Sequence, residues 1–273
     1  MLKTRILTAL VLVTVFVLAM FGLPHKGWIL FCGGILAIAA WEWAALSGML
    51  TIGRAAFASA LFGFGVLIAW GWPAIPRFED IGAYYLIAIA FWALVMPPWL
   101  RNGLRTGGKA IVAASGSAVL LPCFFALVHL HSIAPTVLLS YMAIVWIADS
   151  AAYFAGKAFG KHKLAPSISP GKTWEGVAGA MAAVTAYGIL WIHYFGWGIP
   201  TSVREAPLGW VAVLITIWLL SLFSVCGDLF ESALKRRAGV KDSGKILPGH
   251  GGVLDRIDAL IPVLPMAGML LIL

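Results

Sequence analysis

The chain has 273 residues, of which 62% are hydrophobic and 11% are charged, and its formal net charge is +8 at pH 7. Its mean hydropathy is +0.96. Charged residues usually make up about a quarter of a soluble domain. This chain has a much smaller fraction, so it lacks the polar surface that keeps a globule of its size in water. Composition excludes an ordinary soluble protein and predicts an all-α, polytopic integral membrane protein.

Spans in hydrocarbon must satisfy their own backbone hydrogen bonds, so they are expected to be helices of about 20 residues. Breaks at glycine, proline and charge clusters predict about nine of them. They lie near 5–23, 28–47, 55–73, 81–100, 109–130, 135–156, 175–195, 208–230 and 257–273. Pro97-Pro98 is expected to distort or end the fourth span. Glu42, between Trp41 and Trp43, is interpreted as a residue of the membrane interface.

The basic residues predict the orientation. With a cytosolic N-terminus, nine spans place 16 of the 19 Lys and Arg residues on the cytosolic side. The far side keeps Lys26, Arg77 and Arg204. Cationic loops resist translocation, so this division supports the span count and the orientation together.

The chain divides into two predicted regions. Residues 1–105 form N-terminal transmembrane helices, and residues 106–273 form a C-terminal transmembrane catalytic region. The second region includes two cytosolic loops, 156–173 and 227–256, which are long for connectors and rich in Gly, Pro, His and charge. A transporter or channel would place its polar residues near the bilayer midplane, whereas these gather at one face.

The loop 227–256 combines acids with bases and glycines. If the eighth span continues as a helix past the membrane face, a stripe of four polar residues forms at spacings i, i+3, i+4 and i+7: Asp228, Glu231, Ser232 and Lys235. Asp255 and Asp258 repeat the i, i+3 spacing where the ninth span begins. Carboxylates with lysines and flexible glycine backbone suit a metal-bound polyphosphate, because Mg²⁺ takes a few carboxylate oxygens and completes its shell with water and phosphate. A solvated positive-inside loop is the alternative.

This segment resembles the diagnostic motif of the phosphatidate cytidylyltransferase family, the CDP-diacylglycerol synthases. The matching residues are Ser232-x-x-Lys235-Arg236, Lys241-Asp242-x-Gly244, Leu247-Pro248-x-His250-Gly251-Gly252 and Asp255-Arg256-x-Asp258. The likeness extends over about 140–273, whereas the N-terminal spans match only in their apolar character.

The earlier polar segment also resembles that family. Asp149 lies in the sixth span, and Ser169-Pro170-Gly171-Lys172-Thr173 opens the seventh, where the family usually has Ser-Pro-Lys-Lys-Thr. Gly171 departs from that pattern. Thr173 is expected to cap the helix, with Lys172 directed at a phosphate near the free N–H groups. Asp149 is read either as a partner of Tyr153 or a basic residue, or as a metal or nucleotide contact.

The resemblance implies an enzyme that transfers the cytidylyl group of CTP to phosphatidic acid, forming CDP-diacylglycerol and pyrophosphate. It implies Mg²⁺, in a two-metal site whose second ion the sequence leaves open. The expected catalytic residues are Asp228, Asp255, Lys241 and Lys235. The expected substrate-binding residues are Lys172, Thr173, Ser232, Arg236, Lys245, His250, Arg256 and Asp149. The expected metal ligands are Asp228 and Asp255, with Glu231 and Asp258 as further ligands or supporting partners.

The expected partners are the two substrates and membrane lipids, without nucleic acid, and the family suggests a homodimer. The expected location is the inner (cytoplasmic) membrane, with the active site facing the cytosol. A CDP-alcohol phosphotransferase would be a similar membrane enzyme, but its Asp-Gly-x-x-Ala-Arg motif is absent from the sequence. The sequence does not divide the basic residues between CTP and the lipid headgroup, and some could hold anionic lipids.

Overall fold

The computed structural model describes residues 2–73, 75–104, 108–195, 198–199 and 201–272. These residues are mainly helical, which confirms the predicted all-α membrane class. Within the described ranges, seven helical segments are long and apolar enough to cross a membrane, and two shorter apolar helices, Leu7–Gly22 and Leu260–Ile272, coincide with the first and last expected spans. The count of nine spans stays a prediction. Arg105 and the expected boundary between 105 and 106 lie outside the described residues.

The N-terminal half consists of α1 (Leu2–Gly22), α2 (His25–Leu46), α3 (Thr51–Trp70) and a broken fourth helix. The fourth helix begins as α4 (Phe78–Ala90), widens into a π-helical turn η1 (Phe91–Val95) and resumes as α5 (Met96–Arg101). The turn lies directly before Pro97-Pro98. Proline lacks the N–H for the i−4 bond and collides with that carbonyl, so the wider turn is the expected accommodation. The predicted distortion of this span is confirmed.

The C-terminal half begins with α6 (Lys109–Ile133) and α7 (Pro135–Phe159), followed by a two-stranded antiparallel sheet of β1 (Lys163–Ala165) and β2 (Ser169–Thr173). After this hairpin come α8 (Trp174–Leu190), a second π-helical turn η2 (Trp191–Phe195) and α9 (Thr201–Arg204). The chain continues as α10 (Gly209–Arg237), α11 (Leu254–Ile257) and α12 (Leu260–Ile272).

Both predicted loops are shorter than expected. Helix α7 continues to Phe159, and the remainder of the first segment contains the hairpin instead of irregular loop. Helix α10 continues to Arg237, so the irregular part of the second segment is 238–253. The segment from Asp228 to Lys235 is therefore helical, which is the condition under which its polar residues share one stripe.

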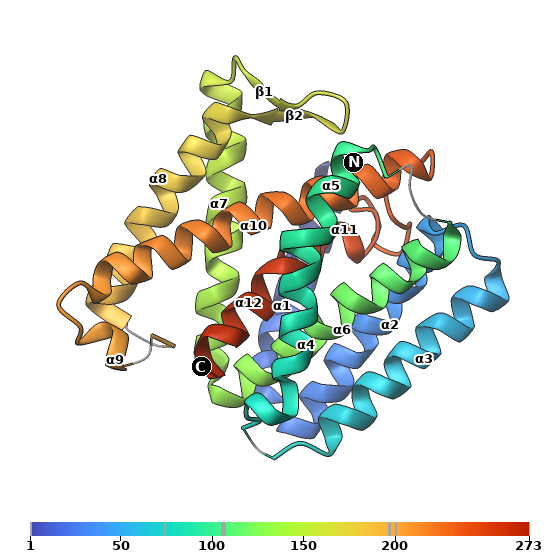
Figure 1. Cartoon of the computed structure of the whole chain (residues 1–273). Coiled ribbons are helices and arrows are strands. Elements are labelled where there is room, and N and C mark those ends of the chain that lie inside the picture. Colours follow the sequence, from blue (N-terminus) through green and yellow to red (C-terminus); the bar gives the residue numbers. More distant parts are fainter. Residues whose placement is uncertain (1, 74, 105–107, 196–197, 200, 273) are drawn as a thin grey trace.

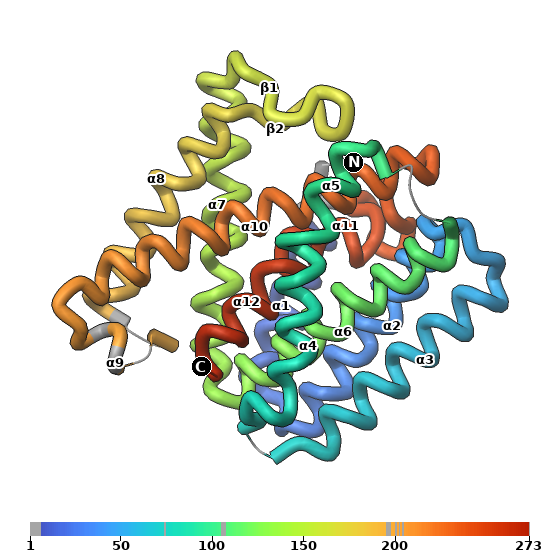
Figure 2. Tube along the Cα trace, in the orientation of Figure 1, coloured from blue at the N-terminus to red at the C-terminus, as the bar shows by residue number. Residues whose placement is uncertain are grey.

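The helices form two groups joined by α10 and α12 (Figure 1; the same path is clear in Figure 2). Helix α7 packs along α8, and α2 packs along α3 and α6. Helix α12 contacts α6 and α10, and α10 reaches from α8 across to α2. The N-terminus lies at the end of the molecule that carries the hairpin and the 238–253 loop, and the C-terminus lies away from that end. Accordingly, Thr8 Oγ1 donates to Pro248 O at 3.1 Å.

Candidate active site

A cavity of about 630 Å³ opens where the hairpin, the C-terminal part of α10 and the start of α11 meet. Most of the residues predicted as functional line it. They are Asp149, Lys172, Thr173, Asp228, Ser232, Lys235, Arg236, Lys241, Asp255, Arg256 and Asp258. Residues about 100 positions apart in sequence therefore share one wall, because α7, the hairpin and α10 pack together.

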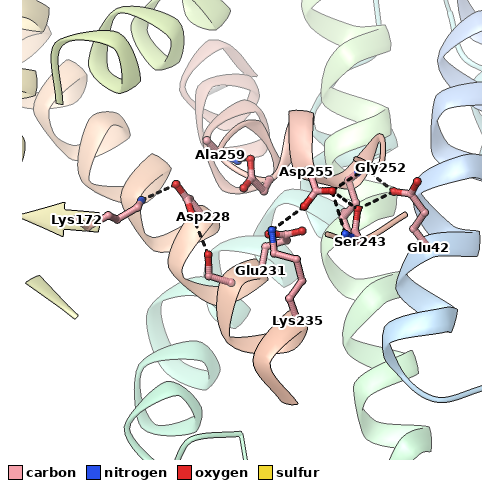
Figure 3. A network of polar contacts seen from close by, with 12 residues as sticks. Glu42, Lys172, Asp228, Glu231, Lys235, Ser243, Gly252, Asp255 and Ala259 are labelled. Atoms are coloured by element: carbon pink, nitrogen blue, oxygen red, sulfur yellow. Dashed lines mark hydrogen bonds and ion pairs between the residues drawn. The ribbon is translucent and has the colours of Figure 1, made fainter. Parts of the chain in front are cut away.

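The hairpin delivers Lys172 to the cavity. Strand β2 ends at Thr173, whose Oγ1 caps α8 by accepting a hydrogen bond from Gly176 N at 3.1 Å, which confirms the predicted cap. Lys172 Nζ lies 2.7 Å from Asp228 Oδ2 on α10, and Ser232 Oγ donates to Asp228 Oδ1 at 3.2 Å (Figure 3). Asp228 keeps a side-chain exposure of 33%, so it remains accessible from the cavity.

A second acidic group lies one helical turn further along α10. Lys235 Nζ forms ion pairs with Glu231 Oε2 and, at 2.6 Å, with Asp255 Oδ1 (Figure 3). Glu231 is almost completely buried and does not line the cavity. Within the described part of the chain, its Oε1 has no hydrogen-bond partner. Lys235 therefore links two carboxylates from different elements. Glu231 holds Lys235 from the buried side, and Asp255 holds it from the cavity.

Asp255 is held by the loop that precedes it. Its Oδ2 accepts hydrogen bonds from Ser243 N at 2.9 Å, Ser243 Oγ at 3.0 Å and Gly252 N at 2.8 Å. Burial acts to raise the pKa of Asp255, but Lys235 and the backbone donors of Gly252 and Ser243 outweigh it and lower the pKa to about 2. Asp255 is thus ionised, but its oxygens are already occupied by protein donors.

Asp258 has the opposite environment. Its only hydrogen bond from the described residues comes from the adjacent Ala259 N, at 2.8 Å. Burial, and then the negative charge of Asp228, raises the pKa of Asp258 to about 7; Asp149 adds to this, while the Ala259 N–H and Lys235 oppose it. Asp149, Asp228 and Asp258 thus bring three carboxylates to one cavity, and among the described residues only Asp228 of these three forms an ion pair, with Lys172.

This donor set fits a hard divalent cation. Mg²⁺ binds through one or two carboxylates and fills its shell with water and phosphate oxygens, and Asp228 and Asp258 both offer oxygens to the cavity. Asp255 would have to exchange protein donors for the ion. No cluster of three or more His, Cys, Asp or Glu side chains that could hold a metal ion occurs in the described ranges.

Lys245 and His250 lie in a neighbouring cavity of about 580 Å³, formed by the 238–253 loop. Lys241, Asp242 and Arg256 line both cavities, so the two share a wall. The left-handed backbone of Gly251, with a φ of 82°, turns the loop at this wall. The predicted substrate-binding residues therefore divide between two adjoining spaces.

Two readings of Asp149 were left open by the sequence: a structural contact with Tyr153 or a basic residue, or a contact with a metal or nucleotide. No hydrogen bond or ion pair to Asp149 occurs among the residues that the structure describes, and Tyr153 points its ring towards Lys157, whose Nζ lies 5.9 Å from the ring centroid. Asp149 lines the cavity, and its role as a metal or nucleotide contact stays a prediction.

Glu42 is the residue that sequence reasoning missed. It was interpreted as a residue of the membrane interface, but its side chain is 1% exposed and reaches the 238–253 loop (Figure 3). Its Oε2 accepts from Ser243 Oγ at 3.0 Å and Leu254 N at 2.8 Å, and its Oε1 accepts from Val253 N at 3.1 Å. Trp43 is also buried, with Nε1 donating to Val112 O at 2.7 Å, so it is not part of an interfacial belt. A lone acid inside an apolar span was the available signal.

Comparison with known proteins gives the class of this site. The family model described as the cytidylyltransferase family matches residues 3–273. The chain belongs to the cytidylyltransferase family, which confirms the resemblance seen in its motifs.

Curated relatives named phosphatidate cytidylyltransferase align over nearly the whole chain. The protein from Pseudomonas aeruginosa is 39% identical, with 99% of this chain and 97% of the relative covered. The protein from Brucella suis is 38% identical, with 95% and 89% covered, and that from Haemophilus influenzae is 32% identical, with 97% and 96% covered. The likeness therefore includes the N-terminal helices and extends beyond the motif region.

Proposed function

We propose that this chain is a phosphatidate cytidylyltransferase that forms CDP-diacylglycerol and pyrophosphate from CTP and phosphatidate. The observation that carries the proposal is the cavity in which carboxylates and basic side chains from α7, the hairpin, α10 and α11 converge. Full-length relatives with that name support the choice of substrates.

In the reaction, a phosphate oxygen of phosphatidate attacks the α-phosphorus of CTP. The new P–O bond forms as the bond between the α-phosphorus and the bridging oxygen breaks, and that oxygen leaves with pyrophosphate. The nucleophile is already an anion at neutral pH, so no strong general base is required. The barrier comes from repulsion between anions and from charge on the leaving group.

The basic side chains of the cavity can lower that barrier by neutralising phosphate charge. Arg236, Lys241 and Arg256 line it without an ion pair among the described residues, so they are available to phosphate oxygens. Lys172, which is paired with Asp228 in this structure, would bind a phosphate oxygen, and Asp228 would be one of the residues that hold the metal. Lys235 is held in place by Glu231 and Asp255 and presents a fixed charge.

Mg²⁺ would be held by Asp228 and Asp258 and would supply charge neutralisation at the phosphates. This assignment keeps Asp228 as a principal ligand. It prefers Asp258 to Asp255 because the Asp255 oxygens are occupied by Lys235, Ser243 and Gly252. A second ion and a homodimer stay predictions.

The chain is a multi-pass membrane protein by its apolar helices. In the proposal it lies in the cytoplasmic membrane with the cavity facing the cytosol, which is where CTP is found. The headgroup of phosphatidate lies at the membrane surface, and the cavity lies at the corresponding ends of α7 and α10.

The test is incorporation of radiolabelled CTP into lipid by the purified protein, with and without Mg²⁺. Phosphatidate should yield labelled CDP-diacylglycerol and one pyrophosphate per turnover, and diacylglycerol, which lacks the attacking phosphate, should yield none. Absence of labelled lipid from the folded wild-type protein would overturn the proposed function. Undiminished turnover after chelation of divalent cations would overturn the metal site alone.

A further inference from the structure

Glu42 connects the N-terminal helices to the 238–253 loop and the start of α11. It lies on α2, more than 200 positions before the residues it contacts. Both carboxylate oxygens accept hydrogen bonds, from Ser243 Oγ and from the backbone N–H groups of Val253 and Leu254. The last two groups lie directly before Asp255, so one side chain fixes the backbone that carries Asp255 to Lys235.

Two motif glycines leave the space that this carboxylate fills. A Cβ at Gly244 would lie 2.3 Å from Glu42 Oε1. A Cβ at Gly252 would lie 2.4 Å from Glu42 Oε2 and 2.2 Å from Ser243 Oγ. Real Cβ atoms do not come so close to other heavy atoms, so any side chain at either position would have to displace Glu42.

Ser243 connects the buried carboxylate to the cavity. Its Oγ lies 3.0 Å from Glu42 Oε2 and 3.0 Å from Asp255 Oδ2. A hydroxyl has one proton to donate, so it serves one carboxylate at a time and keeps both at hydrogen-bond distance. The path from α2 to the substrate cavity therefore runs through Glu42, Ser243 and Asp255 to Lys235.

The base of this path is rigid. The adjacent Trp43 is buried and bonded to Val112 O on α6, and a Cβ at Gly116 would lie 2.5 Å from the Trp43 ring. No ion pair to Glu42 occurs in the described part of the chain, so the donors of the loop and of α11 are the polar partners of this buried carboxyl group. If Glu42 served only to fill space, a glutamine of equal size could replace it without loss of activity.

We infer that Glu42 is a positioning residue for cytidylyl transfer, which holds the 242–254 segment so that Asp255 and Lys235 face the reacting phosphates. The inference rests on the proposed function. Glu42 does not touch the cavity, so it acts only through the loop.

The test variant is Glu42→Gln, which keeps the size of the side chain. The amide has one acceptor oxygen, and its NH₂ group would face a backbone N–H of Val253 or Leu254. The matched control is Trp28→Phe on the same helix, which removes a buried hydrogen bond from Trp28 Nε1 to Leu127 O, 3.1 Å long, away from the loop.

Two measurements are made on both purified, folded variants. Hydrogen–deuterium exchange should be at least about tenfold faster in the 242–254 segment of Glu42→Gln and unchanged there in Trp28→Phe. The kcat of Glu42→Gln should fall by about 30-fold or more, with KM for CTP within about threefold, because Lys172 and Arg236 hold phosphate from other elements. Trp28→Phe should keep its kcat.

Unchanged exchange in Glu42→Gln would overturn the inference, as would faster exchange with a wild-type kcat. Equal effects in both variants would also overturn it, because they would reveal general destabilisation. An inactive wild-type protein would refute the proposed function, while the exchange experiment would still test whether Glu42 anchors the loop.

Discussion

Lys172 Nζ and Asp228 Oδ2 lie 2.7 Å apart, joining the hairpin to α10 across the cavity. In the proposed function, Lys172 binds a phosphate and Asp228 a metal ion, and the ion pair neutralises both side chains before the substrates bind. With CTP and Mg²⁺ bound, Lys172 would contact a phosphate of CTP, and Asp228 would be a ligand of Mg²⁺.

Replacing Lys172 should weaken the handling of phosphate. In Lys172→Met, kcat/KM should fall about 10- to 100-fold, which corresponds to the about 1.5–3 kcal/mol of a charge-assisted hydrogen bond. Lys163→Met is the matched control, because Lys163 lies on the other strand of the hairpin, paired with Thr173, is exposed and lines neither cavity. Steady-state kinetics of both variants make the comparison. Similar losses in the two would mean that general surface charge, and not this position, matters.

The metal assignment predicts different phenotypes for three aspartates. Asp228→Asn and Asp258→Asn should each lower turnover by two or more orders of magnitude, or about 3 kcal/mol, and raise the Mg²⁺ requirement. The double variant should be little worse than either single one, because both residues act through one complex. Asp255→Asn should instead loosen the 242–254 segment and leave the Mg²⁺ concentration for half-maximal activity unchanged.

Mg²⁺ titrations of CDP-diacylglycerol formation separate these outcomes, with thermal unfolding as the control for folding. A raised Mg²⁺ midpoint in Asp255→Asn with a normal midpoint in Asp258→Asn would reverse the assignment of the two residues.

The pKa of Asp258, raised to about 7, predicts a pH dependence. A raised carboxylate pKa means that the neutral acid predominates below pH 7, and a metal ligand must be deprotonated. The Mg²⁺ concentration for half-maximal activity should therefore fall about tenfold per unit from pH 5.5 to 6.5 and become constant above about pH 8. Asp258→Asn should lack this slope. The same slope in that variant would assign the titration to another group.

Gly252→Ala should lower both stability and turnover, because there is no space for a Cβ at this position. The new Cβ would meet Glu42 Oε2 and Ser243 Oγ at less than 2.5 Å, so the loop must move away from α2. We expect a loss of at least about 2 kcal/mol in unfolding free energy together with a large loss of turnover. Gly34→Ala on α2 is the control, because nothing lies within 4 Å of its Cβ position. Thermal unfolding and product formation test both, and a stable, active Gly252→Ala would contradict the packing described here.

The predicted orientation can be tested by labelling single cysteines in a background without Cys32, Cys123 and Cys226. Ser167→Cys in the hairpin and Ile246→Cys in the 238–253 loop are exposed and should react from the cytosolic side. Leu208→Cys, at the start of α10, should react from the opposite side. Labelling of Ser167→Cys from the far side would overturn the positive-inside orientation and the cytosolic active site.

The sequence predicted the helical class and most of the cavity. Apolar runs report lipid exposure directly, and the spacing of Asp228, Ser232 and Lys235 places them on one face once α10 is helical. The extension of α10 to Arg237 was not predicted as such, because a cluster of charged residues has the low hydropathy of a loop. Propensity gave no signal for the short hairpin, whose strands depend on the packing of Thr173 against α7 and α8.

Glu42 could not be connected to the loop from sequence because the contact depends on how α2 packs against α6 and α11, which no local pattern encodes. The flanking tryptophans also resembled an interfacial belt, whereas Trp43 is buried against Val112. The different states of Asp255 and Asp258 depend on which backbone N–H groups face each carboxylate, and that is a property of the folded loop.

The contact between Glu42 and the loop also bears on how the chain can be divided. A fragment that begins after residue 105 would contain every motif residue but would lack α2, and with it the acceptor for Val253 N and Leu254 N. Those two N–H groups would then be left buried and unpaired beside Asp255. Two halves produced as separate polypeptides should regain activity only on reassociation, so the enzyme could serve as a split reporter for proximity within a membrane.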